Sequence, residues 1–415
     1  MKDAAKCIAF SEIATVYNGN SISKKEKQEK YIGLDEGTSY IATKDVGFDH
    51  SIDYENGVLI PDSESSEFKI APKNSVLICA EGGSAGRKVA HTDRDVHFGN
   101  KLFALVPMDR VRSKYLYYYT LSNEFFAQFS ELKAGLIGGV SLKKFKSILI
   151  PLFDLDYQSY VIDFLNEAFS NINDAIANTK KNLGNIEELY KSYLNKFYQI
   201  PQDSVGQKWE VRKLKELCEK ITDGVHKKPT YVDNGIPFIK INNLTSGPGI
   251  SFDGVSYISE KDHKEFTKRT NPEKGDILIT KDGTIGVVRI IDTDVEFSIF
   301  VSVALIKPED KKLSPYLKYA LESPLIQDKM NPQGAALKHI YLKDLREYSI
   351  PLAPEPERTQ IVDTLDTLSD EIQRLELIYN QKLAALKELK QSLLQKAFSG
   401  ELSAATEKEV EEAVA

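Results

Sequence analysis

Two long stretches of the chain carry apolar residues three and four positions apart. The first stretch runs through Ile162, Leu165, Phe169, Ile172, Ile176, Leu183 and Ile186, with the polar Thr179 at one of its positions. The second runs through Leu365, Leu368, Ile372 and Leu375 and, after a shift of register, through Leu383 and Leu386. This spacing places the apolar side chains on one face of an α-helix. Each stretch therefore predicts a long helix with an apolar seam.

The predicted helices are too long to lie on one domain. About 36 residues of α-helix span roughly 54 Å, more than the diameter of a domain of about 140 residues. Two chemically similar seams in one chain most simply pack on each other. We therefore expect an antiparallel helix pair, with a globular domain attached to each helix.

Short apolar runs between glycine, asparagine and aspartate residues predict strands. The runs cover 76–79, 102–106, 277–280 and 301–305. A helix is predicted after each pair of runs, at Tyr115–Phe126 and at Tyr316–Gln327. Each domain then closes on an Ile-Pro-Leu strand, at Ile150–Leu152 and Ile350–Leu352. Proline separates this strand from the long helix that follows it.

The two halves of the chain repeat each other at an offset of about 200 residues. Pro72–Ile78 aligns with Pro272–Leu278, Gly83 and Gly86 with Gly283 and Gly286, and the two Ile-Pro-Leu strands with each other. The predicted fold class is α+β: two mixed α/β domains joined by two long antiparallel coiled-coil helices. The expected parts are a first domain at 1–154, a long helix at 155–199, a linker at 200–208, a second domain at 209–354, a long helix at 355–400 and an acidic tail at 401–415.

Composition limits the possible classes of function. The 415 residues are 41% hydrophobic and 28% charged, which indicates globular domains, and the net charge of −7 disfavours a nonspecific nucleic-acid coat. The three cysteines show no CxxC spacing, so they are expected to be reduced. Neither a signal peptide nor an apolar run of about 18 residues is present in the sequence given, so a cytoplasmic protein without a membrane span is expected.

One motif leaves a catalytic alternative open. Asp62, Glu67 and Lys69 match the wording of nuclease motifs in which two carboxylates bind Mg²⁺. Only four residues separate the two carboxylates, which is few for groups usually presented by paired strands. The glycine-rich segment Gly82–Lys88 lacks the spacing of a phosphate-binding loop, and the histidines lack metal-ligand spacing. No other catalytic, cofactor or metal site is expected.

Several local phrases carry a family resemblance. Thr222–Pro229 contains Asp-Gly-Val-His, Gly275–Ile279 is followed by Gly283 and Gly286, Pro356–Val362 follows the second Ile-Pro-Leu strand, and Gln395–Leu402 ends the second helix. With the repeat, these phrases make roughly residues 10–402 resemble the specificity subunit of type I restriction–modification systems. The first domain departs from the pattern, because Val16–Asn20 stands in place of the Asp-Gly-x-His phrase.

The resemblance implies a noncatalytic subunit with two target-recognition domains. Each domain would read one half of a bipartite, asymmetric target in double-stranded DNA, and the helix pair would set the spacer. Two modification subunits would dock on the helices, and restriction subunits would join through that assembly. S-adenosylmethionine, ATP and Mg²⁺ would belong to the partner subunits. The alternatives are a stand-alone Mg²⁺-dependent nuclease and a helical scaffold that does not bind DNA.

Candidate DNA contacts follow from residue chemistry. Lysine and arginine bind guanine edges or phosphates, and asparagine binds adenine. In the first domain the candidates are Lys44, Asp45, Glu81, Ser84, Arg87 and Lys88. In the second domain they are His226, Lys227, Lys228, Lys240, Asn242, Asn243, Lys281, Asp282, Thr284, Lys338 and His339.

Overall fold

A computed structural model describes residues 6–135, 138–199, 209–330, 339–402, 406, 410 and 412–414. The chain divides into two compact units. The first comprises Met1–Lys180 with Asn380–Ala415, and the second comprises Lys181–Tyr379. Each unit holds one globular domain and parts of both long helices. The predicted linker at 200–208 lies outside the described residues.

The domain of the first unit contains two four-stranded sheets and a two-stranded ribbon. The sheets have the orders β2-β9-β6-β7 and β4-β3-β8-β5, and the ribbon pairs β1 with β10. The strands are β1 (Lys6–Ala9), β2 (Ala14–Asn18), β3 (Thr38–Ile41), β4 (Leu59–Ile60), β5 (Ile70–Ala71), β6 (Val76–Cys79), β7 (Val89–His91), β8 (Val96–Phe98), β9 (Leu102–Pro107) and β10 (Leu149–Leu152). The helices are α1 (Phe10–Ile13), α2 (Lys24–Glu26), α3 (Ser113–Tyr119), α4 (Asn123–Glu131) and α5 (Leu142–Phe145), with short turns η1 (Lys27–Tyr31) and η2 (Asp62–Glu67).

The domain of the second unit repeats the strand order of the first sheet and the ribbon, but the strand order of its second sheet differs at both edges. Its sheets have the orders β12-β19-β16-β17 and β13-β15-β14-β18, and its ribbon pairs β11 with β20. The strands are β11 (Glu210–Lys213), β12 (Cys218–Asp223), β13 (Tyr231–Val232), β14 (Ile236–Ile239), β15 (Ser256–Ile258), β16 (Ile277–Thr280), β17 (Val288–Ile290), β18 (Ser298–Ile299), β19 (Val303–Pro308) and β20 (Ser349–Leu352). The helices are α7 (Ile241–Thr245), α8 (Glu260–Phe266), α9 (Ser314–Glu322), α10 (Pro324–Met330) and α11 (Leu342–Glu347), with turns η3 (Leu214–Glu216) and η4 (Lys311–Leu313).

The predicted strands match the central sheets, but each single predicted helix is in fact a pair. Strands β6 and β16 have the predicted bounds, whereas β19 begins two residues later than expected. The stretch from Tyr115 spans α3 and α4, because the Ser122 hydroxyl accepts a hydrogen bond from Phe125 N and begins a new helix. In the second domain the break falls at Ser323, directly before Pro324. Proline lacks the N–H that would continue the preceding helix.

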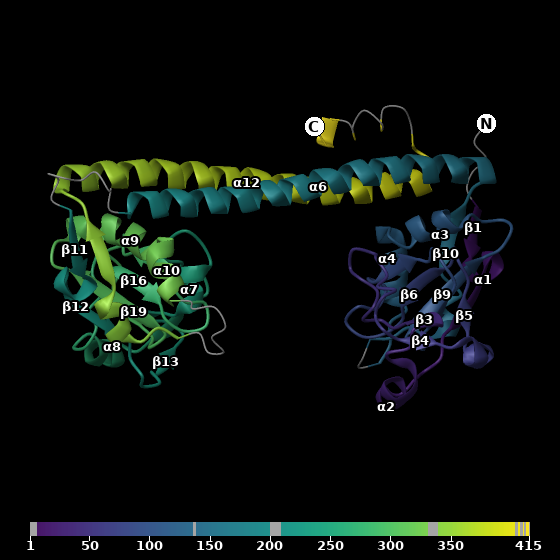
Figure 1. The fold of residues 1–415 in the computed structure, drawn as a ribbon, viewed down its shortest axis with the longest axis horizontal. Helices are drawn as coiled ribbons and strands as arrows, with labels where there is room; N and C mark the ends of the chain where they lie inside the picture. Colours follow the sequence, from purple (N-terminus) through teal and green to yellow (C-terminus); the bar gives the residue numbers. More distant parts are fainter. Residues whose placement is uncertain are drawn as a thin grey trace. The chain divides into compact units, whose positions relative to one another are not determined.

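The two long helices are α6 (Leu155–Phe197, 43 residues) and α12 (Glu355–Ser399, 45 residues), both longer than the seams alone suggested. Within the first unit, the start of α6 lies beside the end of α12 (Figure 1). The Tyr157 hydroxyl donates to Ala397 O, and Lys390 bonds Asn173. Because the α6 residue number rises while its partner's number falls, the helices run antiparallel.

The apolar seam of the first unit is closely packed. Leu165 and Ile172 are fully buried in one cluster with Leu386 and Leu393, and Ile162, Phe169 and Ile176 pack against that cluster. Thr179, the polar seam position, is also buried, and its hydroxyl donates to Ala175 O at 2.7 Å. This local bond satisfies the hydroxyl without a partner from the other helix.

The seam of the second unit is looser. Leu365 is fully buried and Leu368 packs on the same cluster, as do Leu194 and Tyr198 near the end of α6. Ile186 and Ile372 are 9% exposed, and Leu183 is half-buried. Leu383, which belongs to the first unit, is also half-buried. Leu375, which the heptad pattern placed in the seam, is 37% exposed. Leu375 is the last seam position before the register shift that the sequence predicts.

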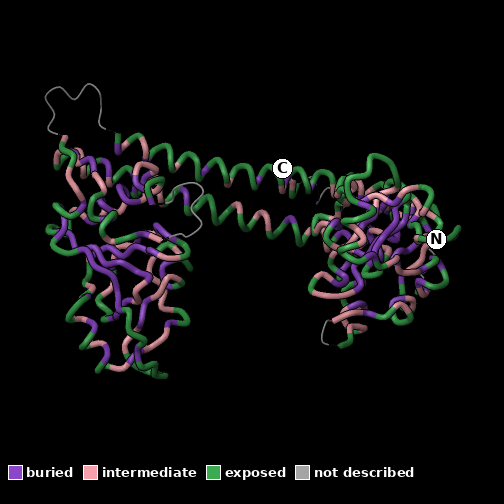
Figure 2. Tube along the Cα trace, turned by 60° about the horizontal axis from the view of Figure 1, so that its bottom comes forward, coloured by how far each residue is buried: buried purple, intermediate pink, exposed green. Residues whose placement is uncertain are grey.

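Burial separates the domains from the helices. Figure 2 shows buried backbone concentrated in the strands of each domain, whereas exposed and buried positions alternate along the long helices. Each domain has a second, smaller core between its two sheets, around Phe98 and Leu77 in one and around Ile299 and Leu278 in the other. The strands are thereby fixed, and the loops at their ends have defined positions.

Candidate nucleic-acid interface

The Asp-Gly-x-His phrase builds a charged cluster at the end of β12. The Asp223 carboxylate is buried and lies 3.2 Å from Lys281 Nζ, 2.5 Å from Arg269 Nη2 and 3.4 Å from His226 Nε2. Burial alone would raise the pKa of Asp223, but hydrogen bonds from Lys281 and Arg269 outweigh it and hold the pKa below its usual value. The Lys281 side chain is itself only 6% exposed. Lys281, a candidate DNA contact, is therefore committed to an internal ion pair.

The glycine of the phrase is a steric requirement that both domains share. A Cβ at Gly224 would lie 2.2 Å from Ile299 O, and a Cβ at Gly19 would lie 1.9 Å from Phe98 O. Both glycines directly follow the strand, β12 or β2, that pairs with the long central strand of its sheet. In the first domain, too, the backbone after the strand passes directly over a carbonyl oxygen of another strand. The residue before the glycine differs, since the first domain has Asn18 where the second domain has Asp223.

The cations after the phrase are exposed. His226 and Lys227 have side chains 64% and 66% exposed, and Lys227 Nζ lies 3.6 Å from the Glu265 carboxylate. Lys228 is also exposed. Exposed flexible ammonium groups are the groups that neutralise phosphates. The geometry therefore suits phosphate contact better than base reading by these lysines.

The turn at the start of α7 uses two of its candidates internally. Asn243 is buried; its side-chain oxygen accepts from Lys240 N, and its amide donates to Ser251 O. Lys240 Nζ bonds Ser256 Oγ at 3.0 Å and lies 4.7 Å from the centre of the Tyr231 ring. Asn242 is exposed. Of the three candidates, Asn242 is the one whose side chain faces solvent.

The glycine turn of the second domain lies against the segment that begins at His339. Asp282 and His339 form a backbone bridge, and their side chains form an ion pair when His339 is protonated. Ile340 N donates to Lys281 O at 2.8 Å. Thr284 is exposed at the tip of the turn. Lys338 lies outside the described residues.

The corresponding positions of the first domain carry different charges. Asp45 is buried; it accepts from Ala42 N at 2.8 Å and from Lys44 Nζ at 2.7 Å. This carboxylate holds its turn as Asn243 holds the equivalent turn in the second domain. Glu81 pairs with Lys101 at 2.7 Å. The first glycine turn thus begins with an acidic residue, whereas the second begins with Lys281.

The remaining first-domain candidates gather at the end of the glycine turn. Ser84 Oγ lies 3.3 Å from Cys79 Sγ, inside the turn. The Arg87 guanidinium and the Lys88 ammonium both lie over the Phe48 ring, at 5.2 and 5.1 Å from its centre. The structure therefore brings Arg87 and Lys88 together at the surface, whereas Ser84 serves the turn.

The nuclease alternative is not supported. Asp62 and Glu67 stand at opposite ends of the turn η2, and the Lys69 ammonium bonds Asn18 O at 2.8 Å. Within the described ranges, no group of three or more His, Cys, Asp or Glu side chains could hold a metal ion. The same described part of the chain holds no helix with the length and hydropathy of a membrane span.

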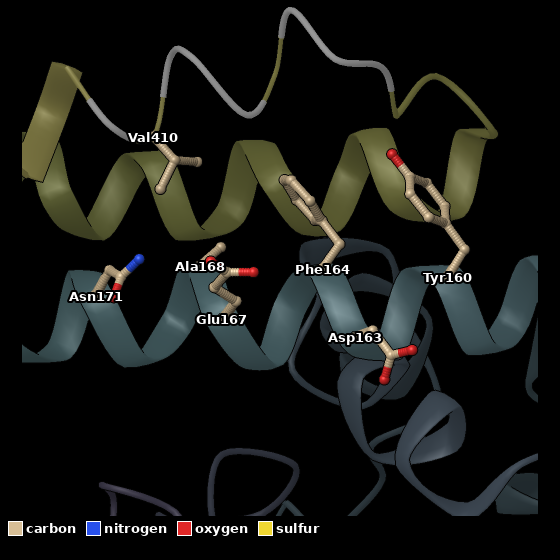
Figure 3. A pocket seen from close by; sticks show the side chains of 7 residues that line it. All are labelled: Tyr160, Asp163, Phe164, Glu167, Ala168, Asn171 and Val410. Carbon is tan, nitrogen blue, oxygen red and sulfur yellow. The ribbon is translucent and has the colours of Figure 1, made fainter.

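A separate cavity of about 360 Å³ lies on α6 in the first unit. Figure 3 shows Tyr160, Phe164 and Val410 around it, with the carboxylates of Asp163 and Glu167 at its edge. Val410, in the segment after α12, is buried. Candidate DNA contacts do not line this cavity, and its acidic edge is unsuited to a phosphate backbone.

Sequence reasoning missed two residues that organise the surface. Arg269 binds Asp223 from a sequence distance of 46 residues, and nothing in its own segment marks it. Phe48 is 59% exposed beside two cations, but exposure of a lone aromatic cannot be read from a local pattern. An alignment of the two halves does locate Gly19, because it follows its strand as Gly224 does.

Comparison with known proteins agrees with this architecture. The family described as "Type I restriction modification DNA specificity domain" matches residues 6–185 and 206–386. The specificity subunit of the type I restriction enzyme EcoBI of Escherichia coli is 23% identical, over 96% of this chain and 86% of that protein. The EcoKI specificity subunit of Escherichia coli strain K12 is 24% identical, over 81% of this chain and 76% of that protein.

The fold also matches a solved structure of the type I restriction–modification system. That chain aligns with a TM-score of 0.76 at 18% identity, over 96% of this chain and 99% of the other. Fold and surface define a class: duplicated proteins with two α/β domains, each followed by a long helix. Within that class, the chain belongs to the type I restriction–modification DNA specificity family, whose members are specificity subunits and not catalytic subunits.

Proposed function

We propose that each domain of this specificity subunit reads one half of a bipartite target in double-stranded DNA. The observation that carries this proposal is the repetition itself. Two domains with the same order of strands in their first sheet each present a glycine turn and nearby exposed cations, and each is followed by one long helix. Two similar readers in one chain suit a target made of two separate parts.

The differences between the domains support an asymmetric target. Asn18 replaces Asp223 before the shared glycine, and Glu81 replaces Lys281 at the start of the glycine turn. At the glycine turn of the first domain, the nearby cation is Lys101, which forms an ion pair with Glu81. Similar folds with different polar groups at equivalent points would select different bases. The two half-sites should therefore differ in sequence.

The long helices would set the spacer and dock two modification subunits, through which restriction subunits would join. Along the exposed part of α12, Leu375, Leu377 and Ile378 are 37, 59 and 46% exposed. Exposed apolar side chains on a helix favour contact with another protein. Methyl transfer and ATP-dependent cleavage would then use S-adenosylmethionine, ATP and Mg²⁺ in those partners.

Methylation mapping tests this proposal. Cells that carry the gene should methylate one bipartite sequence that cells without the gene leave unmodified. Replacing residues 210–350 with the equivalent domain of a relative should change one half of that sequence and keep the other. A change in both halves would contradict independent reading, and failure to shift any DNA together with the modification partner would favour a scaffold.

The cofactor assignment has its own test. Calorimetric titration of the purified chain with S-adenosylmethionine and with ATP should give no binding in the micromolar range. Tight binding of either ligand would place the chemistry in this chain. The modification partner, titrated in the same way, is the positive control.

A further inference from the structure

The loop after β3 is built to hold its tip rigidly. Val46 is fully buried, and Asp45 closes the loop, since Asp53 N donates to Asp45 O at 2.8 Å. Across the tip, Gly47 N donates to Ser51 O at 3.0 Å. A Cβ at Gly47 would lie 2.0 Å from Asp49 Oδ1, so a larger residue would displace the Asp49 side chain, which accepts a hydrogen bond from Ser51 Oγ. The loop therefore has little freedom to change shape.

The tip is also fastened to the glycine turn and to β7. Lys88 Nζ donates to Thr43 O at 3.1 Å, and His50 Nδ1 lies 3.0 Å from Val89 O. His50 has a positive φ of 70°, a conformation that costs free energy in a residue with a side chain. Strain held by surrounding contacts is common where a protein presents a functional group.

The group presented is Phe48. The residue is 59% exposed, and the Arg87 guanidinium and the Lys88 ammonium lie 5.2 and 5.1 Å from the centre of its ring. The fold itself does not require an aromatic there: in the second domain, Ser246 stands three residues after Asn243, as Phe48 stands three residues after Asp45. A rigid, exposed phenyl ring close to two cations suits a polyanion with apolar groups in its grooves.

We propose that Phe48 contacts a thymine methyl group in the half-site read by the first domain, while Arg87 binds a flanking phosphate. This inference rests on the proposed DNA-reading function and adds a specificity-determining residue to it. In the major groove, thymine is distinguished by its C5-methyl group, which apolar side chains contact. The rigid loop would bring Phe48 to that methyl without an ordering cost on binding.

The test uses the full chain assembled with its modification subunit, on duplexes that carry the mapped target. Phe48→Ala should weaken cognate binding by about tenfold to a hundredfold, the effect of burying one phenylalanine side chain. Replacing the contacted thymine by deoxyuridine removes only the methyl and should weaken wild-type binding about fourfold. In Phe48→Ala the two duplexes should bind equally.

Salt dependence separates the ring from the cations. Phe48→Ala should leave the slope of log affinity against log salt unchanged, whereas Arg87→Ala should reduce it by about one. Met108→Ala is the matched control, since Met108 is 42% exposed in the same domain and should not affect binding. Phe48→Leu, which keeps an apolar side chain, should retain part of the thymine preference and shows that the variants fold.

The outcomes distinguish this inference from the proposed function. If the wild type binds no mapped target, the DNA-reading function fails. If the wild type binds and Phe48→Ala binds equally well, or loses the same factor on every DNA sequence, Phe48 is not a specificity residue. A first half-site without any A·T pair would also overturn the thymine assignment.

Discussion

In each domain, one backbone carbonyl oxygen determines which residue can follow the strand at the candidate DNA-binding surface. At Gly19 and Gly224 the chain crosses carbonyl oxygens so closely that even a methyl group has no room. These glycines are therefore explained by packing and need no contact with DNA. The polar residues around these glycines differ between the domains. The same close approach of two backbone segments can therefore support different DNA sequence preferences in the two domains.

Gly224→Ala should destabilise the second domain by about 1–3 kcal/mol, because the new methyl would overlap Ile299 O. Gly184→Ala is the matched control, because the same substitution there should raise the stability instead of lowering it. Gly184 lies within α6, and beyond the backbone of its own helix no described atom lies within 4 Å of the position that a Cβ would take. Alanine there should stabilise the protein by about 0.5–1 kcal/mol. Thermal unfolding of the two variants measures both effects, and equal melting temperatures would contradict the steric argument.

The charge on Asp223 should contribute to stability only above acid pH. Its pKa is lowered in the folded protein, so the contribution is present above the unfolded value of about 4 and is lost as pH falls through the folded value. Asp223→Asn leaves Lys281 buried without its carboxylate and should cost about 3 kcal/mol near pH 7.

The measurement is the melting temperature of wild type and Asp223→Asn between pH 3 and pH 7. The gap between the two proteins should narrow as the pH falls below about 4. Asp233→Asn, at an exposed position of the same domain, is the control and should follow the wild type. A gap that stays constant down to pH 3 would show that Asp223 carries no stabilising charge.

At the scale of elements, the spacing of apolar residues and the glycine, asparagine, aspartate and proline residues between apolar runs predicted most of the fold. The runs at 76–79 and 277–280 are fully buried strands, so their apolar character is continuous and legible. The helix seams were legible because the period persists over many turns. The break at Ser122 was missed, since an apolar period continues across it from Tyr119 to Phe125. Capping by a serine hydroxyl overrode that period.

The candidate site was less predictable, for a physical reason. Lys281 and Asn243 have the residue types that bind DNA, but their partners Asp223 and Ser251 lie on other segments. A side chain's availability depends on those tertiary partners, which local sequence does not specify. Phe48 shows the converse case, since its exposure depends on the loop that presents it.

Leucine-to-alanine substitutions along α12 should show which part of the apolar seam contributes to the free energy of unfolding. Leu386 is 1% exposed in the packed part of the seam, and Leu386→Ala should cost about 2–5 kcal/mol. Leu375 is 37% exposed, and Leu375→Ala should change the unfolding free energy of the isolated chain by less than about 0.5 kcal/mol. Chemical denaturation compares the two variants. A large loss of unfolding free energy in Leu375→Ala would show that Leu375 packs in the seam.

At the scale of the whole molecule, the proposed function needs a device that fixes the distance between two half-sites. Helices α6 and α12, of 43 and 45 residues, are each continuous from one end to the other. At about 1.5 Å per residue, either would be roughly 65 Å long. Two major-groove sites on one face of DNA are about 34–36 Å apart. Each helix is thus long enough to serve as a ruler.

Helix length should then determine the spacer of the methylated target. Inserting four residues into α6 near Asn178–Leu183, and four into the exposed stretch of α12 near Leu377, adds about one helical turn, or roughly 6 Å. Since four residues nearly complete a turn, each seam stays close to its original phase. We expect both half-sites to be kept and the spacer to lengthen by about one or two base pairs.

A matched pair of two-residue insertions at the same points is the control for length without phase. Two residues rotate each seam by about 200°, so the apolar faces separate and methylation should be lost. Methylome sequencing of cells carrying each variant reads the spacer directly. If the four-residue variant still methylates the original spacer with undiminished efficiency, the distance between half-sites is set elsewhere, and the long helices serve only to bind the modification subunits.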